Sequence, residues 1–167
     1  MTRVAARFAD ELVLNLVTPD HVASTRAQLD HVAGSVGRPA PRLAVWVPAA
    51  LDPGERAFAQ LARQLAVYLA APGYGELFAG LGFGDLVQRA RAGSPRAELA
   101  DAVPPELLEQ IGALGSTRQL AARIAAYHEA GADHVAIVPS TAEDPAGAQL
   151  LDAVRQIDPT QRPAARV

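Results

Sequence analysis

The chain has 167 residues, and half of them are hydrophobic, which is enough to bury one compact core. Its formal charge of -3 and its lack of basic clusters argue against a nucleic-acid partner, and the absence of cysteine excludes disulfides and thiolate metal sites. Because no apolar run approaches the ~20 residues that span a bilayer, we expect a cytoplasmic protein without a membrane partner.

The first expected strand covers residues 11–17, ELVLNLV, where only Asn15 interrupts an apolar run. Such runs are typical of strands that are buried on both faces of a parallel sheet. The Thr18-Pro19-Asp20 sequence then supplies an N-cap hydroxyl, a proline at the first helical position and an acidic first turn. A helix is therefore predicted over residues 19–33, before the glycines at 34 and 37.

The second expected strand covers residues 42–47, RLAVWV, and Pro48 is expected to close it because proline cannot donate to a ladder. A capping box of Asp52 and Glu55 predicts that a helix follows, with apolar residues as far as position 69. From about residue 74 to residue 105 the chain has short helical pieces broken by glycine and proline. This stretch is too long for an ordinary connection and predicts a helical insertion.

The third expected strand covers residues 110–114, QIGAL, and is supported mainly by the turn and the amphipathic segment 118–130 that follow it. Ser116 and Gln119 are spaced to form a capping box, and Gly131 is placed to end that helix. The fourth expected strand covers residues 134–138, HVAIV, before a last helix over residues 145–157. We expect the end of the chain, residues 159–167, to be frayed.

Strands that alternate with helices in this order predict an α/β fold with a parallel sheet. The segments FADELVLNLVTPD and GADHVAIVPSTAED also align without a gap, so the first and last strand units share one design. Either the two units are true repeats or they share only the cues common to any strand followed by a helix.

Four segments carry a family resemblance: ADELVLNLVTP, PRLAVWVP, YLAAPGYGELFAGLGF and GSTRQLAARIAAYHEAGADHVAIVP. In this order, from residue 1 to about residue 145, the chain resembles the luciferase-like monooxygenase superfamily and is most similar to its deazaflavin-dependent branch. The resemblance implies strands five to eight of a TIM (β/α)₈ barrel, which typically needs about 250 residues. The expected fold is therefore a partial, half TIM barrel over residues 1–158, with about four parallel strands, helices and the insertion.

The resemblance also implies what a half-barrel lacks. In the family, the first half supplies much of the bed for the flavin-type ring, including a non-prolyl cis peptide, and many substrate-facing residues. An isolated half leaves two strand edges unpaired, so a homo-oligomer or another association through the open barrel edges is expected. Met1 falls inside what resembles the helix before strand five, which favours a fragment or a truncated product.

Barrel chemistry occurs at the carboxyl ends of the strands, where helix N-termini attract anions. Asn15 and Thr18 lie at this end of the first expected strand. The resemblance implies that this position contacts the phosphate or side chain of a cofactor. Thr18 also suits a plain N-cap, which is its commoner role, whereas Asn15 needs a polar partner from the backbone or from a ligand.

Other candidate positions have similar alternatives. Gly115 and Ser116 have the composition of a phosphate-binding turn, and equally of a helix cap, as has the loop 140–143. Tyr74 resembles a position that approaches the cofactor or substrate channel in the family, with packing as the alternative. Trp46 is expected either to face the barrel interior or to fill the core.

The four histidines lack metal-ligand spacing, so no metal site is predicted, and no nucleophile elbow is present. The resemblance implies an oxidoreductase that transfers a hydride between coenzyme F-420, or alternatively FMN, and a small organic substrate. No catalytic residue is assigned. The alternative is a catalytically inactive half-barrel that serves as an assembly or interaction subunit.

Overall fold

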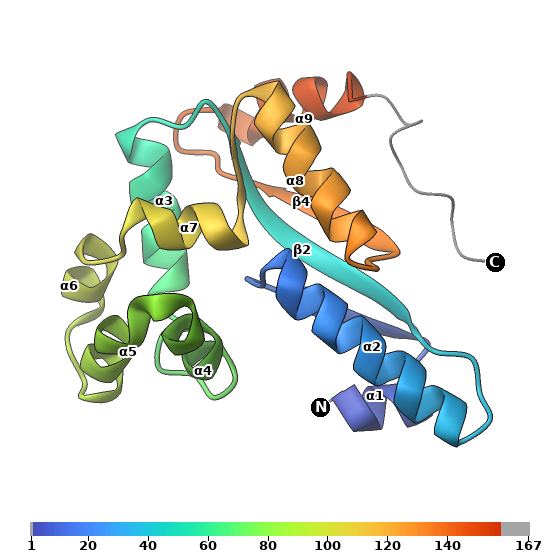
Figure 1. Cartoon of the computed structure of the whole chain (residues 1–167). Coiled ribbons are helices and arrows are strands. Elements are labelled where there is room, and N and C mark those ends of the chain that lie inside the picture. The colour runs from blue at the N-terminus through green and yellow to red at the C-terminus, as the bar shows by residue number, and fades with distance from the viewer. Residues whose placement is uncertain (1, 158–167) are drawn as a thin grey trace.

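The computed structural model describes residues 2–157, so the predicted frayed tail lies outside the described residues. A four-stranded parallel sheet combines with helices, as the sequence predicts (Figure 1). The strands are β1 (Glu11–Asn15), β2 (Arg42–Leu51), β3 (Ala113–Gly115) and β4 (His134–Pro139). The helices are α1 (Thr2–Phe8), α2 (Pro19–Ser35), α3 (Glu55–Leu65), α4 (Tyr74–Phe78), η1 (Ala79–Phe83), α5 (Gly84–Arg91), α6 (Arg96–Asp101), α7 (Pro105–Ile111), α8 (Thr117–Glu129), η2 (Pro145–Gly147) and α9 (Ala148–Arg155).

The long strand β2 organises the sheet because it pairs with the three other strands. The backbone N–H groups of Arg42 and Asp52 donate to Asp10, before β1, and to Gly115 of β3. The carbonyl of Ala49 instead accepts from Ser140, after β4. Because alternate residues of a strand direct their backbone groups to opposite edges, β1 and β3 lie end to end on one edge of β2, and β4 lies on the other.

Pro48 does not close this strand, and that prediction is wrong, since β2 continues to Leu51. Pro48 is an even number of residues from Arg42, so its nitrogen faces the edge that β1 and β3 share. It falls between Trp46, where the β1 ladder ends, and Ala49, where the β3 ladder begins. The missing N–H group is therefore located where no ladder needs it.

The third predicted strand is wrong at its start, because Gln110 and Ile111 belong to α7. Pro105 occupies the first helical position, which favours a helix there, and Leu107, Leu108 and Ile111 are buried at helical spacing. Only positions 113 and 114 of the predicted strand lie in β3.

The start of α3 also differs from the prediction. The N-cap is Gly54, and Asp52 has a positive φ of 41°, so the predicted capping box of Asp52 and Glu55 does not form. The carboxylate of Glu143 takes its place and accepts hydrogen bonds from the N–H groups of Gly54 at 2.8 Å and Arg56 at 3.2 Å. The helix ends at Leu65, earlier than its apolar pattern predicts.

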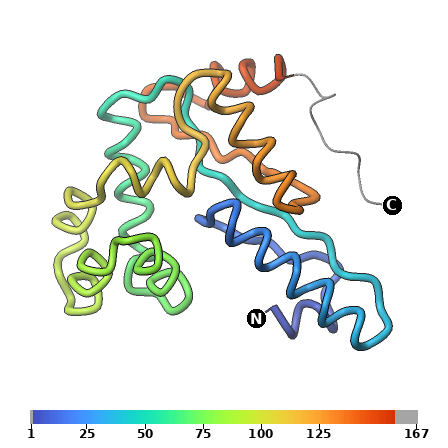
Figure 2. Tube along the Cα trace, in the orientation of Figure 1, coloured from blue at the N-terminus to red at the C-terminus, as the bar shows by residue number. Residues whose placement is uncertain are grey.

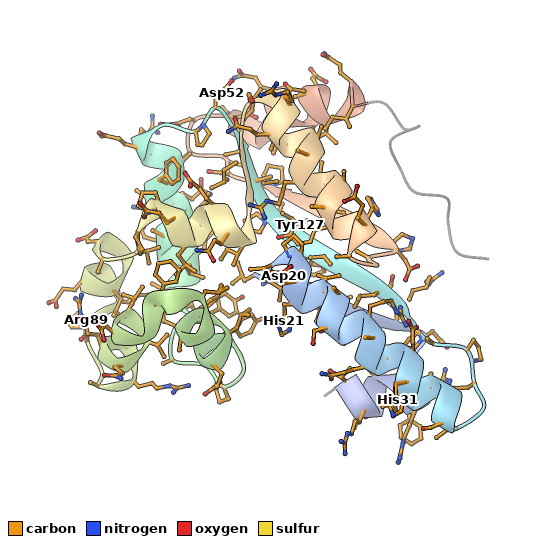
Figure 3. The ribbon with its side chains drawn as sticks, viewed as in Figure 1. Asp20, His21, His31, Asp52, Arg89 and Tyr127 are labelled. Atoms are coloured by element: carbon orange, nitrogen blue, oxygen red, sulfur yellow. The ribbon has the colours of Figure 1, made fainter. Side chains whose placement is uncertain are left out.

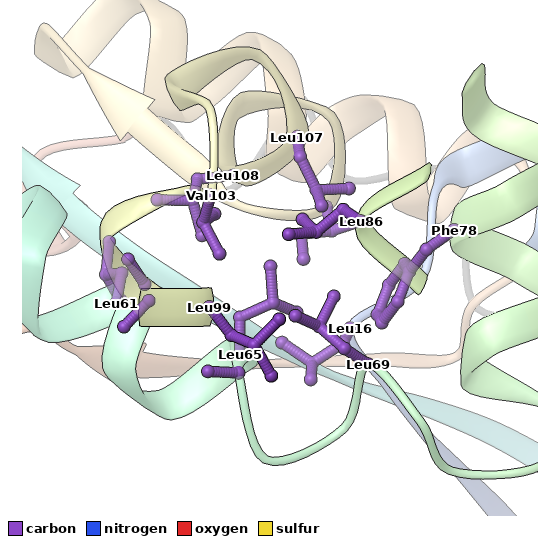
Figure 4. Close-up of a cluster of buried hydrophobic side chains, with 14 of the residues drawn as sticks. Leu16, Leu61, Leu65, Leu69, Phe78, Leu86, Leu99, Val103, Leu107 and Leu108 are labelled. Carbon is purple, nitrogen blue, oxygen red and sulfur yellow. The ribbon is translucent and has the colours of Figure 1, made fainter. Parts of the chain in front are cut away.

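Two hydrophobic cores result. One lies between one face of the sheet and α1, α2, α8 and α9, with Val45, Val47 and Tyr127 fully buried at its centre. The other lies within α3 to α7, here called the helical cluster, which forms a separate group of coils in the chain trace (Figures 1 and 2). Leu16 extends from the end of β1 into this second core (Figure 4).

The opposite face of the sheet is largely open. Three apolar side chains are roughly half exposed there: Val13 on β1 at 45%, Trp46 on β2 at 52% and Val138 on β4 at 42%. Their common side follows from the register, which aligns Val13 with Ala44 and Val138 with Pro48. Ala44 and Pro48 each lie two residues from Trp46 along β2, so all three positions face the same side of the sheet. We call these three residues and the strands that carry them the open face.

Candidate functional site

A pocket of about 300 Å³ lies along β1, between α1, α2 and the turn that precedes α4. Most of its lining is apolar, including Val13 and Leu77, and its polar groups are contributed by Asn15, His21 and Tyr74 together with two threonines. Small-molecule sites have this character, with an apolar wall and a few converging polar groups. We call it the Asn15 pocket.

Asn15 and Tyr74 meet in this pocket although 58 residues separate them along the chain. Asn15 is the last residue of β1, and Tyr74 begins α4 directly after Gly73, whose φ of 87° reverses the chain. Burial and the nearby Tyr68 raise the pKa of Tyr74, whereas a hydrogen bond with the Asn15 side chain lowers it. Asn15 and Tyr74 therefore present an amide and a hydroxyl group to the same pocket.

The aromatic ring of Tyr74 is held from two sides. Its centroid lies 4.9 Å from that of Tyr68 and 6.2 Å from that of Phe78, both in tilted arrangements. Aromatic pairs prefer such geometries. Packing against its own helices, the alternative role for Tyr74, therefore coexists with a hydroxyl group directed toward Asn15.

His21 is the residue of this pocket that sequence reasoning missed. It lies in the first turn of α2, on the side of that helix toward α4 (Figure 3). Burial lowers its pKa, so the imidazole is neutral near neutral pH. The sequence did offer a signal, because His21 follows closely after an expected strand. The spacing of the histidines was an argument against a metal site only. Within residues 2–157, no group of three or more His, Asp or Glu side chains is arranged to bind a metal ion.

Thr18 lies close to this pocket but is not part of its lining. Its hydroxyl oxygen accepts a hydrogen bond of 3.2 Å from the backbone N–H of His21, and its side chain is buried. It is therefore the N-cap of α2, which was the commoner of its two expected roles.

Gly115 and Ser116 lie elsewhere, where β2 and β3 end. Gly115 lines a second cavity of about 770 Å³ that extends along α8, together with Asp52 and Arg123. Its φ is 116°, and a side chain there would meet Gln119 at 2.5 Å. Ser116 and Gln119 form the predicted capping box, in which the side-chain oxygen of Gln119 accepts from the backbone N–H of Ser116 at 2.9 Å. The Ser116 hydroxyl also donates to this oxygen at 2.8 Å.

The loop after β4 fastens the sheet to α3. The side-chain oxygen of Gln60, on α3, accepts from the Ser140 hydroxyl at 2.9 Å and from the Ala142 N–H at 2.8 Å. The carboxylate of Glu143 accepts from the N–H of Gly54 at the start of α3. The last helix is capped instead by Asp144, which accepts from the N–H of Leu150 at 2.9 Å. The polar groups of this loop are thus engaged within the protein.

Comparisons with known proteins agree with this architecture. The family model described as luciferase-like monooxygenase matches residues 1–134. No curated protein matches the chain. Among solved structures, coenzyme F-420-dependent tetrahydromethanopterin reductase from Methanopyrus kandleri is similar with a TM-score of 0.70 and 15% identity, over 98% of this chain and 48% of that one.

A second solved structure is similar in the same way. It is an F-420-dependent secondary alcohol dehydrogenase in complex with an F-420-acetone adduct, with a TM-score of 0.65 and 17% identity. The match covers 97% of this chain and 46% of that one, so the chain spans about half the length of both structures.

At this identity the two structures establish the fold, a half of the luciferase-like TIM barrel, as the sequence predicts. Within residues 2–157, no helix has the length and apolar character needed to cross a membrane. The matching family model covers most of the chain. The chain therefore belongs to the luciferase-like monooxygenase family.

Proposed function

We propose that this chain forms one half of a cytoplasmic oxidoreductase that transfers a hydride between coenzyme F-420 and a small organic substrate, with FMN as the alternative cofactor. The observation that carries the proposal is the Asn15 pocket, which brings Asn15 and Tyr74 together at the carboxyl end of a barrel strand. Both similar solved structures are F-420-dependent enzymes, which favours the deazaflavin over FMN.

The residues present fit the hydrogen-bonding part of such a cofactor. Asn15 and Tyr74 offer an amide and a hydroxyl, and the neutral imidazole of His21 lies in the same pocket. Thr18 lies at the edge of this group, and Gly115 with Ser116 offers a second contact at the end of β3, five residues further along β2. A bound deazaflavin or flavin supplies the hydride chemistry, and these side chains orient it.

Binding measurements test this proposal directly. We expect oxidised or reduced F-420 to bind the purified chain, detected by cofactor fluorescence and by a rise in melting temperature. Tyr74→Phe removes one hydroxyl and should weaken binding about fivefold, equivalent to about 1 kcal/mol. Tyr68→Phe is the matched control, because Tyr68 packs against Tyr74 and does not line the pocket.

An inactive half-barrel that serves as an assembly subunit is the second candidate, and the open face favours it. The two candidates differ in the titration. If neither F-420 nor FMN binds in either redox state, the cofactor role fails for this chain while its family membership stands.

A further inference from the structure

Three hydrogen-bond donors in the loop after β4 converge on a single oxygen atom. The Ser140 hydroxyl and the backbone N–H groups of Thr141 and Ala142 donate to the side-chain oxygen of Gln60 at 2.9, 3.0 and 2.8 Å. A neutral amide oxygen has only two lone pairs, so three donors exceed what it accepts with good geometry. An anionic oxygen forms stronger bonds with such donors and matches this arrangement better.

The backbone of the same loop supplies two of these donors in succession. Consecutive N–H groups that are directed at one point make a concave site for an anion. Thr141 and Ala142 present such a pair directly after the carboxyl end of β4, and barrels bind their ligands at this end of the strands. Ser140 is 3% exposed and adds a buried hydroxyl to the pair.

Gln60 is held in this position mainly by its oxygen. Its side-chain nitrogen donates to the Thr141 hydroxyl at 3.4 Å, which is longer than an ordinary hydrogen bond. Gln60 is also partly exposed, so its side chain can rotate into solvent. An anionic oxygen that took its place would restore all three of the hydrogen bonds that Gln60 releases.

The side of α3 that carries Gln60 is basic. Arg56 and Arg63 lie four residues before and three residues after Gln60, and these spacings place them on the same side of the helix. Both are exposed, and in the described part of the chain neither guanidinium group forms an ion pair. The adjacent carboxylates of Glu143 and Asp144 accept from N–H groups at the starts of two helices, which offset their charge.

We propose that residues 140–142 form a phosphate-binding site, which Gln60 occupies when no phosphate is bound. The ligand is a small molecule with a terminal phosphate group, whose oxygen replaces that of Gln60 while Arg56 and Arg63 attract its charge. None of these residues lines the Asn15 pocket. The site is therefore separate from that pocket and does not depend on the proposed function.

Titration of the purified chain with inorganic phosphate, at constant ionic strength in sodium chloride and observed by phosphorus NMR, tests the proposal. Gln60→Ala vacates the site and should bind phosphate about tenfold more tightly than the wild type, because no side chain has to be displaced. Gln60→Glu fills the site with a carboxylate and should abolish binding. Gln88→Ala, at an exposed glutamine of α5, is the matched control and should bind phosphate as the wild type does.

The loop itself is tested by Ser140→Ala in the Gln60→Ala background. This change removes one donor and should weaken phosphate binding about fivefold. An unchanged affinity would contradict the part assigned to the Ser140 hydroxyl.

Circular dichroism establishes that each variant is folded. Gln60→Asn, whose shorter side chain also vacates the site, replaces Gln60→Ala if the alanine variant does not fold. A folded variant of this kind that binds phosphate no more tightly than the wild type overturns the proposal, since Gln60 would then only fasten the loop to α3. So does phosphate binding that survives Gln60→Glu, because the anion would then bind elsewhere.

Discussion

The hydroxyl group of Tyr127, on α8, donates a 2.7 Å hydrogen bond to the backbone carbonyl of Val17, 110 residues earlier in the chain. The same hydroxyl lies 3.2 Å from the carbonyl of Ile111, at the end of α7. Tyr127 thus joins the segments that follow β1 and precede β3, which lie end to end along β2, and it is fully buried.

Tyr127→Phe leaves these two buried carbonyls without the hydroxyl donor while it keeps the ring that fills the core. We expect the free energy of unfolding to fall by about 1 to 3 kcal/mol, measured by urea denaturation. Tyr68→Phe is the control, because no hydrogen bond of the Tyr68 hydroxyl is found within residues 2–157. Equal losses in both variants would contradict the role assigned to the Tyr127 bond.

Alkaline pH should destabilise the protein through the same residue. Burial raises the pKa of Tyr127 from 10.0 to about 12, so the folded protein retains this proton where the unfolded chain loses it. The stabilising contribution is complete below pH 10 and is lost as the pH rises toward about 12. Denaturation curves measured across this range should fall more steeply for the wild type than for Tyr127→Phe, and parallel curves would count against this assignment.

Leu16 has a positive φ of 55° and is buried in the core of the helical cluster. Leu16→Ala removes most of the side chain but keeps the backbone strain, and should cost about 2 to 5 kcal/mol. Leu16→Gly loses slightly more packing and relieves strain of about 1 to 2 kcal/mol. Glycine should therefore be no worse than alanine here, the reverse of the usual order. Thermal unfolding of the two variants checks this, and a glycine variant that melts clearly below the alanine variant would contradict it.

Mild acid should act on His21. Because burial lowers its pKa below the ordinary value of 6.5, the unfolded chain binds this proton more readily than the folded protein does. The stabilising contribution is present above pH 6.5 and decreases as the pH falls through the lowered pKa. His21→Gln should reduce this pH dependence, while His31→Gln, an exposed residue of the same helix, should leave it unchanged.

The histidine itself can be titrated by NMR. Its ring signals should have a midpoint below 6.5 in the folded protein. A midpoint at or above that value would show that the imidazole is better solvated than the Asn15 pocket allows.

Much of this fold could be predicted because local signals and tertiary packing agree. Thr18 caps α2, Ser116 and Gln119 cap α8, and Gly131, with a φ of 100°, ends that helix as expected. The four parallel strands follow from apolar runs and turn residues. Each of these features depends on a few neighbouring residues.

The errors arose where distant residues decide the structure. Pro48 is tolerated in β2 because the ladders of two other strands leave a gap at its nitrogen. Glu143 reaches the start of α3 from 89 residues away and replaces the cap that Asp52 was expected to provide. The pairing of Asn15 with Tyr74, and the presence of His21 beside them, likewise depends on how α4 folds back on β1.

The division into two cores has a consequence for engineering and for divergence within the family. Leu16 is the point where the end of β1 enters the core of the helical cluster, and Leu77 packs against both cores. A grafted cluster from another family member would need to match few positions on the sheet. The helical cluster could then be exchanged between family members as one unit while the strands of the sheet stay unaltered.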